Sequence, residues 1–272
     1  MAYQNPKFGF LHAAADAGEP ALTSSSSPEA ATGYPLAHLV DYRPSSLFTF
    51  GQTGARYVTV DRGAGTLEEI DRVVVPAGHN LATATLIRVH TSTTGVFSGE
   101  ETLRVGWNQS SEPDVSGIID KEFTAETDDR YVRFYVLSPA GTAWSFGQLW
   151  YTATRQAATI GPKPDWTDQP VSNLIVRELP TREATSILGA NRRSFSLEHL
   201  HLESTDLEVY DDLFEQCSVG GRPFYFWPPD DSEVPLLMRI TDRQVTRIHD
   251  FPAPASGRFM YRVRFSMIEQ TT

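Results

Sequence analysis

The residues from 204 to 217 are the one stretch of this chain with the apolar spacing of an amphipathic helix. Thr205 is the predicted N-cap, because its side-chain oxygen can accept a free amide and Glu208 can reach back to it. Asp206 adds negative charge in the first turn, where the helix dipole favours it. The apolar stripe consists of Leu207, Tyr210, Leu213, Phe214 and Cys217. We therefore predict one helix that lies on a sheet in a chain that is otherwise all β.

The segment after the helix predicts how that sheet continues. The glycine pair at 220–221 is expected to end the helix in the left-handed conformation. Phe224–Trp227 then forms a strand whose two phenylalanines point inward. Tyr225 and Trp227 are expected to point outward, and outward aromatic rings followed by prolines are typical of a protein–protein surface. These two residues are candidates for an oligomer or partner interface.

Between residues 34 and 154 the chain is a series of short runs rich in β-branched and aromatic residues. Glycine, proline, asparagine and serine separate these runs and predict turns. Along 131–136, apolar residues alternate with Tyr131, Arg133 and Tyr135, so one face of this strand is apolar and the other is mixed. Short strands at this spacing predict a jelly-roll β-sandwich.

Changes of composition along the chain predict its domain organisation. Residues 1–33 contain one short strand, Phe8–Leu11, followed by a flexible arm of small and polar residues. The jelly roll occupies 34–154, and a proline-rich linker occupies 155–172. A small β-barrel or sandwich domain with the one helix fills 173–272. The predicted fold class is therefore mostly β, in two domains.

Two long strands dominate the predicted C-terminal domain. The apolar phase slips in the middle of 193–202, which predicts a β-bulge near 198–199. In the strand 258–269, alternate positions place three cations on the face opposite to the apolar side chains: Arg258, Arg262 and Arg264. This arginine face is suited to acidic groups of a neighbouring copy, and heterologous contacts of that kind close rings.

Composition excludes several classes of function. The net charge is −11, which argues against nucleic acid as a partner, because phosphate contacts need clustered cations. The single cysteine, Cys217, allows no internal disulfide. No apolar run approaches 18 residues, so no membrane insertion is expected. The first residues lack the pattern of a secretory signal, so we expect folding in a cytoplasm.

Four motifs, in order, resemble one known family: Pro35-Leu-Ala-x-Leu-Val-Asp41, Tyr57-Val-Thr-Val-Asp61, Ile70–Leu81 and Arg130–Phe134. Their order is similar to that of galactose-binding-like (discoidin-type) jelly rolls, a family in which many members bind no sugar. The resemblance covers residues 33–154. At Asp41–Phe48 the chain departs from the family's common Asp-Gly-Asp-x-x-Thr-x-Trp start, so the family's metal-supported loop is not expected here.

The order of elements in 173–269 carries a second resemblance. A strand, one capped helix, an aromatic strand after Gly-Gly-Arg-Pro-Phe, a long hairpin and a final strand ending Phe-Ser-Met-Ile-Glu resemble the small β-domain of long-tailed bacteriophage tail proteins. Tail-tube and distal tail proteins share this domain. In typical distal tail proteins the ring-forming domain comes first, whereas here it comes second.

The tail resemblance implies a structural role. The chain would be a component of a phage tail tip that forms a ring with its own copies or docks on the tail tube. Its partners would be tail-tube and tail-tip or hub proteins, and its place would be the virion, after synthesis in the host cytoplasm. The jelly roll would contact other tail proteins or host surface polysaccharide. The alternative is a carbohydrate-binding adhesin module without a ring-forming role.

Aromatic and amide side chains in predicted loops are the candidate glycan ligands: Tyr42, Arg43, Trp107, Asn108 and Gln109. Aromatic faces stack on sugar rings, and planar polar groups fix the orientation of a ligand. Residues of this kind in loops also pack as structure or contact a partner, and this alternative stays open.

No residue is assigned a catalytic role, and no cofactor is expected. The acidic pairs, such as Asp128–Asp129 and Asp211–Asp212, diverge in direction on a strand or a helix, so they are poor acid–base pairs. His199 and His201 point the same way on a strand, but a third metal ligand is missing, so no metal site is assigned. The sequence therefore predicts a binding or structural protein rather than an enzyme.

Overall fold

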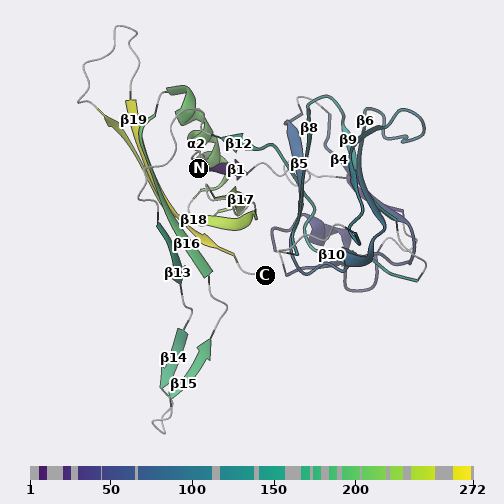
Figure 1. Cartoon of the computed structure of the whole chain (residues 1–272), viewed down its shortest axis with the longest axis horizontal. Helices are drawn as coiled ribbons and strands as arrows, with labels where there is room; N and C mark the ends of the chain where they lie inside the picture. Colours follow the sequence, from purple (N-terminus) through teal and green to yellow (C-terminus); the bar gives the residue numbers. More distant parts are fainter. Residues whose placement is uncertain are drawn as a thin grey trace. The chain divides into compact units, whose positions relative to one another are not determined.

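The computed structural model describes residues 6–10, 21–25, 30–43, 45–64, 67–111, 117–137, 141–156, 167–171, 174–178, 184–188, 192–202, 204–218, 221–228, 234–248 and 260–270. The chain forms two compact units. One unit, which we call the jelly-roll unit, is Leu11–Thr154. The other, the helix-bearing unit, combines Met1–Phe10 with Arg155–Thr271. Both units are built mainly from antiparallel strands, as the sequence predicts (Figure 1).

The jelly-roll unit consists of two main layers of strands (Figure 1). The larger is a five-stranded antiparallel sheet in the order β2 (Ala21–Ser24), β4 (Arg56–Asp61), β9 (Tyr131–Leu137), β6 (Leu86–Ser92), β7 (Thr102–Trp107). The smaller is a three-stranded sheet in the order β11 (Trp150–Thr152), β5 (Ile70–Val75), β8 (Ile119–Glu126). A further pair joins β10 (Ser145–Phe146) to β3 (Phe48–Thr49), and the 3-10 turns η1 (Leu36–Leu39) and η2 (Leu81–Thr83) complete the unit.

The predicted alternation along β9 is confirmed. Val132, Phe134 and Val136 are fully buried and belong to one apolar cluster with residues from both sheets. The side chains between them, including Arg133 and Tyr135, are only half-buried. They lie on the face of the five-stranded sheet that points away from the core, which we call the open face. Alternate side chains of a strand point to opposite faces, so the core face fixes what the open face presents.

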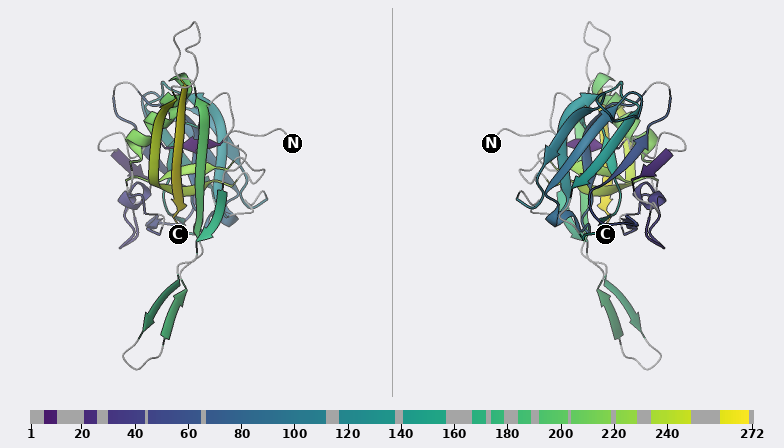
Figure 2. Two further views of the ribbon diagram at one scale, coloured as in Figure 1. Left: turned by 90° about the vertical axis from the view of Figure 1, so that its left-hand side faces the viewer. Right: turned by 90° about the vertical axis from the view of Figure 1, so that its right-hand side faces the viewer.

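In the part of the helix-bearing unit that the structure describes, a seven-stranded sheet lies with one helix (Figure 2, left). Its strand order is β12 (Arg155–Gln156), β1 (Lys7–Gly9), β17 (Phe224–Trp227), β18 (Leu236–Ile248), β19 (Met260–Glu269), β16 (Arg192–Leu202), β13 (Thr167–Val171). β14 (Leu174–Glu178) and β15 (Ala184–Leu188) form a separate two-stranded ribbon. The large sheet ends at β12 and β13, so it is open and does not close into a barrel.

The predicted helix is present as α2, Ser204–Gln216. Tyr210, Leu213, Phe214 and Cys217 on its apolar stripe are buried, as predicted. The N-cap prediction is wrong, because the helix begins at Ser204 and Thr205 already lies inside it. The glycine pair also acts differently from the prediction. Gly221 has no left-handed backbone, and it is needed because a Cβ there would lie 2.7 Å from the carbonyl oxygen of Ser218. Gly220 lies outside the described residues.

The first strand of the chain belongs to the helix-bearing unit rather than to a separate N-terminal arm. β1 pairs antiparallel with β17 on one side and with β12 on the other. The physical reason is the burial of Phe8, whose ring packs against Tyr210, Phe226 and Phe265. Residues 11–154 thus follow one strand of a hairpin and precede the other, so the jelly-roll unit is an insertion between β1 and β12.

Two strands also occur where the sequence predicts only a linker, because β12 and β13 both start within 155–172. The predicted bulge in β16 is confirmed by a shift of its register with β19 between His199 and Leu202. The predicted apolar face of β19 is confirmed as well, since Val263, Phe265 and Met267 are buried.

Candidate functional site

The predicted glycan ligands Trp107 and Gln109 belong to the core. Trp107 ends β7, is 6% exposed and donates a hydrogen bond from Nε1 to Oε1 of Gln109 over 2.7 Å. Gln109 is buried. The side-chain oxygen of Asn108 accepts hydrogen bonds from the amide and the hydroxyl of Ser110, so it shapes the turn. The prediction that Trp107 and Gln109 face a ligand is therefore wrong, whereas Asn108 is half-buried and its role in binding stays a prediction.

Tyr42 and Arg43 lie in different surroundings. Tyr42 has a left-handed backbone, with φ of 57°, and its ring packs edge-on against Trp150 of β11 with centroids 5.5 Å apart. Arg43 is exposed, and its amide donates to a carboxylate oxygen of Asp41. The structure therefore places Tyr42 on the smaller sheet and Trp107 in the larger one. It does not assemble the predicted glycan-binding group at one surface.

The expectation that Tyr225 and Trp227 lie on the outer surface is wrong, since they are 1% and 6% exposed. Arg262 and Arg264 of the predicted arginine face are exposed, and Arg262 forms an ion pair with Glu198 over 2.6 Å. Arg258 lies outside the described residues. The role of these arginines in contacts with a partner stays a prediction.

His199 acts as a core residue. It is buried beneath α2, where its Nε2 hydrogen-bonds with the hydroxyl of Tyr210 over 3.1 Å. Burial lowers the pKa of His199 to about 4, so the ring is neutral at physiological pH. Across the parts of the chain that the structure describes, no three His, Cys, Asp or Glu side chains gather in a geometry that could hold a metal ion. None of the described helices is long and apolar enough to cross a membrane.

A pocket of about 420 Å³ lies on the open face of the five-stranded sheet, and sequence analysis did not single it out as a site. Its lining comes from β6, β9 and the β6–β7 loop: Leu86, Arg88, His90, Phe97, Glu101, Arg133, Tyr135 and Leu137. The right-hand view of Figure 2 looks onto the strands of this unit. The lining combines aromatic and aliphatic surface with a few charged groups, as small-molecule sites commonly do.

The antiparallel register of β6 and β9 brings these residues together. His90 lies opposite Arg133, and Arg88 lies opposite Tyr135. Val89 and Phe134, which lie between these two pairs, are fully buried. Because side chains alternate between the faces of a sheet, both polar pairs lie on the open face. The buried valines and phenylalanine thus fix the pocket's floor.

Arg133 is the central group of the pocket wall. Its guanidinium carbon lies 3.8 Å from the ring centroid of Tyr57 and 3.7 Å from that of Phe97. Its Nε donates to the hydroxyl of Thr59 over 3.0 Å. Burial lowers the pKa of Arg133, but the group stays charged at any physiological pH. Cation–π contacts on both faces hold the guanidinium flat and in one orientation.

Phe97 reaches Arg133 from a loop with unusual backbone geometry. Phe97 has φ of 49°, a left-handed conformation that bulky residues rarely adopt, and Gly95 and Gly99 on either side also have positive φ. A Cβ on Gly95 would lie 3.1 Å from the ring of Tyr131, so only glycine lets the loop approach the sheet this closely. Backbone strain of this kind commonly marks functional loops, and here its effect is to place an aromatic ring over a cation.

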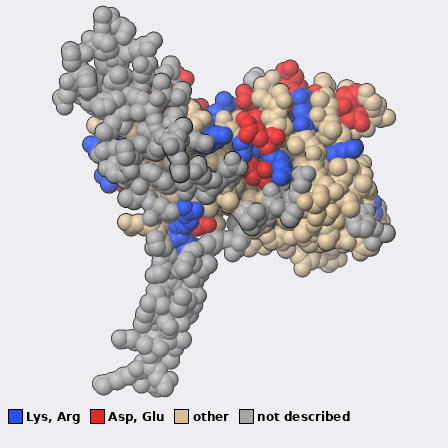
Figure 3. Space-filling view, in the orientation of Figure 1, with Lys and Arg blue, Asp and Glu red and all other residues tan. Residues whose placement is uncertain are grey.

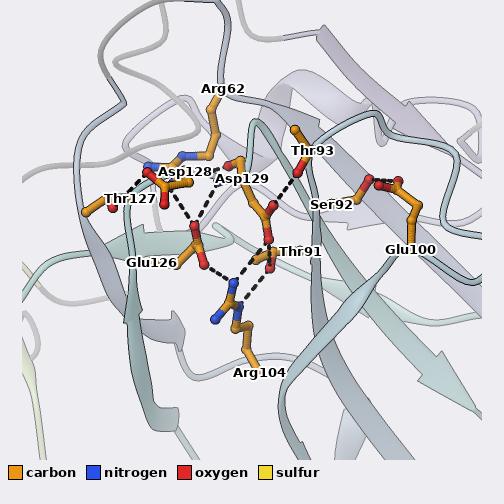
Figure 4. A network of polar contacts seen from close by, with 10 residues as sticks. All are labelled: Arg62, Thr91, Ser92, Thr93, Glu100, Arg104, Glu126, Thr127, Asp128 and Asp129. Atoms are coloured by element: carbon orange, nitrogen blue, oxygen red, sulfur yellow. Dashed lines mark hydrogen bonds and ion pairs between the residues drawn. The ribbon is translucent and has the colours of Figure 1, made fainter.

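A polar network anchors both ends of this loop (Figure 4). Glu100 accepts hydrogen bonds from Ser92 and Thr94, which tie the loop to itself. Nearby, the guanidinium of Arg104 on β7 pairs with Glu126 on β8 and Asp129, and also donates to Thr91 on β6. These contacts join β6 and β7 of the five-stranded sheet to β8 of the three-stranded sheet, next to the loop that carries Phe97.

Arg88 and His90 complete the charged lining. Among the described residues Arg88 makes no hydrogen bond or ion pair, and its stem lies close to Gly106, where a Cβ would be 3.3 Å from Cγ of Arg88. The Nδ1 atom of His90 is buried without a hydrogen-bond partner. Burial, then the charge of Arg88, lowers the pKa of His90, while Glu101 opposes this shift. The pocket therefore presents two cations and a neutral imidazole.

A second hollow lies between α2 and β18 in the helix-bearing unit, lined by Asp211, Phe214, Glu215, Ser218, Arg243 and Val245. Its cation is already engaged, because Arg243 donates to the carbonyl of Phe214 over 3.0 Å and lies over the phenyl ring of that residue. Figure 3 shows that Lys and Arg lie interspersed with Asp and Glu on the visible face of the described residues, without a broad field of one sign. The open-face pocket is therefore the better candidate for a ligand site.

No family model matches the chain, and no curated protein matches it. Several solved structures are similar in fold to about half of it. Chitosan-binding module 1 of a Paenibacillus sp. IK-5 chitosanase/glucanase has 19% identity and a TM-score of 0.40, and the match covers 53% of this chain and 99% of that one. A Clostridium perfringens module, CpGH89CBM32-5, in complex with GalNAc-β-1,3-galactose, has 18% identity, a TM-score of 0.41 and coverage of 51% and 99%. The module CBM32-3 from a Clostridium perfringens family 31 glycoside hydrolase has 14% identity, a TM-score of 0.38 and coverage of 51% and 93%.

Proposed function

We propose that the jelly-roll unit binds a saccharide in the open-face pocket. The observation that carries the proposal is the arrangement of Phe97, Arg133 and Tyr135: two aromatic rings and a fixed planar guanidinium converge on one hollow. A pyranose ring offers apolar C–H faces and a rim of hydroxyls, so it fits a site that combines aromatic faces with planar hydrogen-bond donors. The pocket volume lies within the range of roughly 300–1,000 Å³ that is usual for small-molecule sites.

The test is a glycan array probed with the full-length chain, followed by calorimetric titration of the best ligand. Tyr135→Ala removes an aromatic ring from the pocket and is expected to weaken binding about tenfold or more, as loss of a contacting aromatic commonly does. Tyr42→Ala is the matched control, because that ring packs on Trp150 in the other sheet. The proposal fails if no glycan binds, or if Tyr42→Ala abolishes binding while Tyr135→Ala retains it.

The tail-tip role expected from the second resemblance stays a second proposal, and so does a location in the virion. Two features support assembly of copies through the helix-bearing unit. Among the described strands its sheet ends at β13, and a sheet edge is a template for a neighbouring strand. Arg264 also offers an exposed cation beside the Arg262–Glu198 pair. Light scattering coupled to size-exclusion chromatography tests it: a ring gives a fixed multiple of the chain mass, whereas a monomer at every concentration contradicts self-assembly.

A further inference from the structure

We propose that the saccharide of the open-face pocket is acidic and that Arg88 and Arg133 bind its carboxylate. This inference rests on the function proposed above and narrows the class of ligand. It comes from the hydrogen-bonding state of the two arginines, their register on the sheet and the charge of the pocket.

The two arginines keep N–H donors that the described part of the protein does not use. The Nε of Arg133 donates to Thr59, and its guanidinium lies against the rings of Tyr57 and Phe97. Its two terminal amino groups make no hydrogen bond among the described residues. Arg88 donates to no described acceptor. A guanidinium presents its donors in a fixed fork that matches the two oxygens of a carboxylate. The stacked Arg133 is therefore preorganised for such a ligand.

Other arginines of the same unit show what this chain does when an arginine is structural. Arg72 binds Asp120 and Glu122, Arg104 binds Glu126 and Asp129, and Arg130 binds Asp61. Carboxylates are plentiful in a chain with 34 acidic residues and a net charge of −11. Arg88 and Arg133 are half-buried in one pocket and form no ion pair within the described residues, although Glu101 lines the same pocket and interacts electrostatically with Arg133.

The register of the sheet places both arginines in the lining of one pocket. Arg133 lies opposite His90, and Arg88 is two residues before His90 on the same face of β6. Diagonal neighbours of this kind in an antiparallel pair are about 7–8 Å apart at the backbone. Nε of Arg133 lies toward Thr59 on β4 and the stem of Arg88 lies toward Gly106 on β7, and both side chains line the same pocket. His90 lines the same pocket, and its Nδ1 is buried from solvent without a hydrogen-bond partner.

The net charge of the pocket favours a singly charged ligand. Two arginines and one glutamate, Glu101, leave one positive charge, because His90 has a lowered pKa and is neutral. Glu101 would repel a phosphate dianion more strongly than a carboxylate. It also offers an acceptor for sugar hydroxyls, which a simple anion lacks. An acidic sugar uses both features at once.

The experiment compares matched sugars that differ only in the oxidation of C6. The full-length chain is titrated with oligogalacturonate and with the galactose oligomer of equal length, and acetate and hexaglutamate serve as carboxylates without a sugar. The expected result is at least tenfold tighter binding of oligogalacturonate than of each other probe. Arg133→Gln is expected to remove about ten- to hundredfold of that affinity, the usual value of a charge-assisted hydrogen bond.

Arg130→Gln is the charge-matched control, because it removes one cation from the same unit but one that is already paired with Asp61. It should leave the affinity within about twofold. Equal binding of acidic and neutral oligomers would overturn the acidic-sugar inference and leave the saccharide proposal standing. Equal binding of hexaglutamate and oligogalacturonate would overturn the saccharide proposal and identify an acidic protein segment as the ligand. Binding of no sugar at all would overturn both.

Discussion

Two arginines in the jelly-roll unit, Arg104 and Arg133, lie in contrasting electrostatic surroundings. Arg104 lies at the end of the sandwich, 15% exposed in its side chain, and is enclosed by Glu126, Asp129 and Thr91 (Figure 4). Arg133 lies on the open face, where aromatic rings hold it, and among the described residues it forms no ion pair, with Glu101 as the nearby carboxylate of the same pocket. In the first arrangement the cation is paired with carboxylates of the protein itself. The second fixes the orientation of a cation that can still bind an anionic ligand.

The difference shows that pairing, rather than residue type, separates a structural cation from a candidate ligand-binding one. Removing a partner from a buried ion pair leaves an uncompensated charge, which costs stability. Removing a cation that has no partner costs little stability and removes only what the cation would bind. Stability and affinity measurements on matched substitutions therefore separate the two regions.

The largest effect is expected from Arg104→Ala. The substitution leaves Glu126 and Asp129, both largely buried, without their cation, so we expect a loss of about 3–5 kcal/mol in the free energy of unfolding of this unit. Amide hydrogen exchange in β6, β7 and β8 measures the effect, because it resolves this unit within the full chain. Wild-type protection in those strands would show that the network is not structural.

Arg72→Ala should have a smaller effect on the same measurement, about 2 kcal/mol. Arg72 joins β5 to Asp120 and Glu122 of β8, but the side chain of Glu122 is 65% exposed and regains water when its partner is lost. Arg130→Ala is the reference for an exposed pair, whose loss should leave the free energy of unfolding nearly unchanged because water screens the pair. Equal losses of unfolding free energy for Arg72→Ala and Arg130→Ala would show that burial does not determine how much these ion pairs stabilise the unit.

Phe97→Gly should separate affinity from stability most clearly. Glycine suits the left-handed backbone at this position, so the loss of the ring contact is partly offset and stability should change by less than about 1 kcal/mol. Affinity for the acidic probe should fall about tenfold, because Arg133 loses one of its two ring contacts. Titration calorimetry and thermal unfolding of the same sample give both values. Retained affinity would exclude the ring from the site.

The smallest effect is expected from pH, through His90. Its pKa is lowered in the free protein by burial, then by Arg88 and Arg133 against the opposing charge of Glu101. A bound carboxylate would raise that pKa, so binding takes up a proton and affinity should rise a few-fold as pH falls from 7 toward 5. A His90→Gln variant should lack this rise. Affinity that falls with pH over the same range would contradict a carboxylate beside His90.

Much of the architecture could be predicted from local sequence. The helix at 204–216 follows from its apolar spacing, and the two faces of β9 and β19 follow from strict alternation. The predicted loop ligands failed because an aromatic residue beside amides has the same local signature whether it packs or binds. Trp107 and Gln109 satisfy each other in the core, and no spacing rule reveals that pairing.

The sequence by itself determined the fold class, the helix at 204–216, the mixed face of β9 and the excess of acidic residues, against which an arginine without an ion pair is informative. Only the tertiary structure decided that β1 joins a sheet completed more than 140 residues later, because that depends on which core buries Phe8. Only the register of β6 with β9, and a strained loop that sets Phe97 on Arg133, decided where the pocket lies. Both are long-range choices, set by how side chains distant in sequence exclude water together.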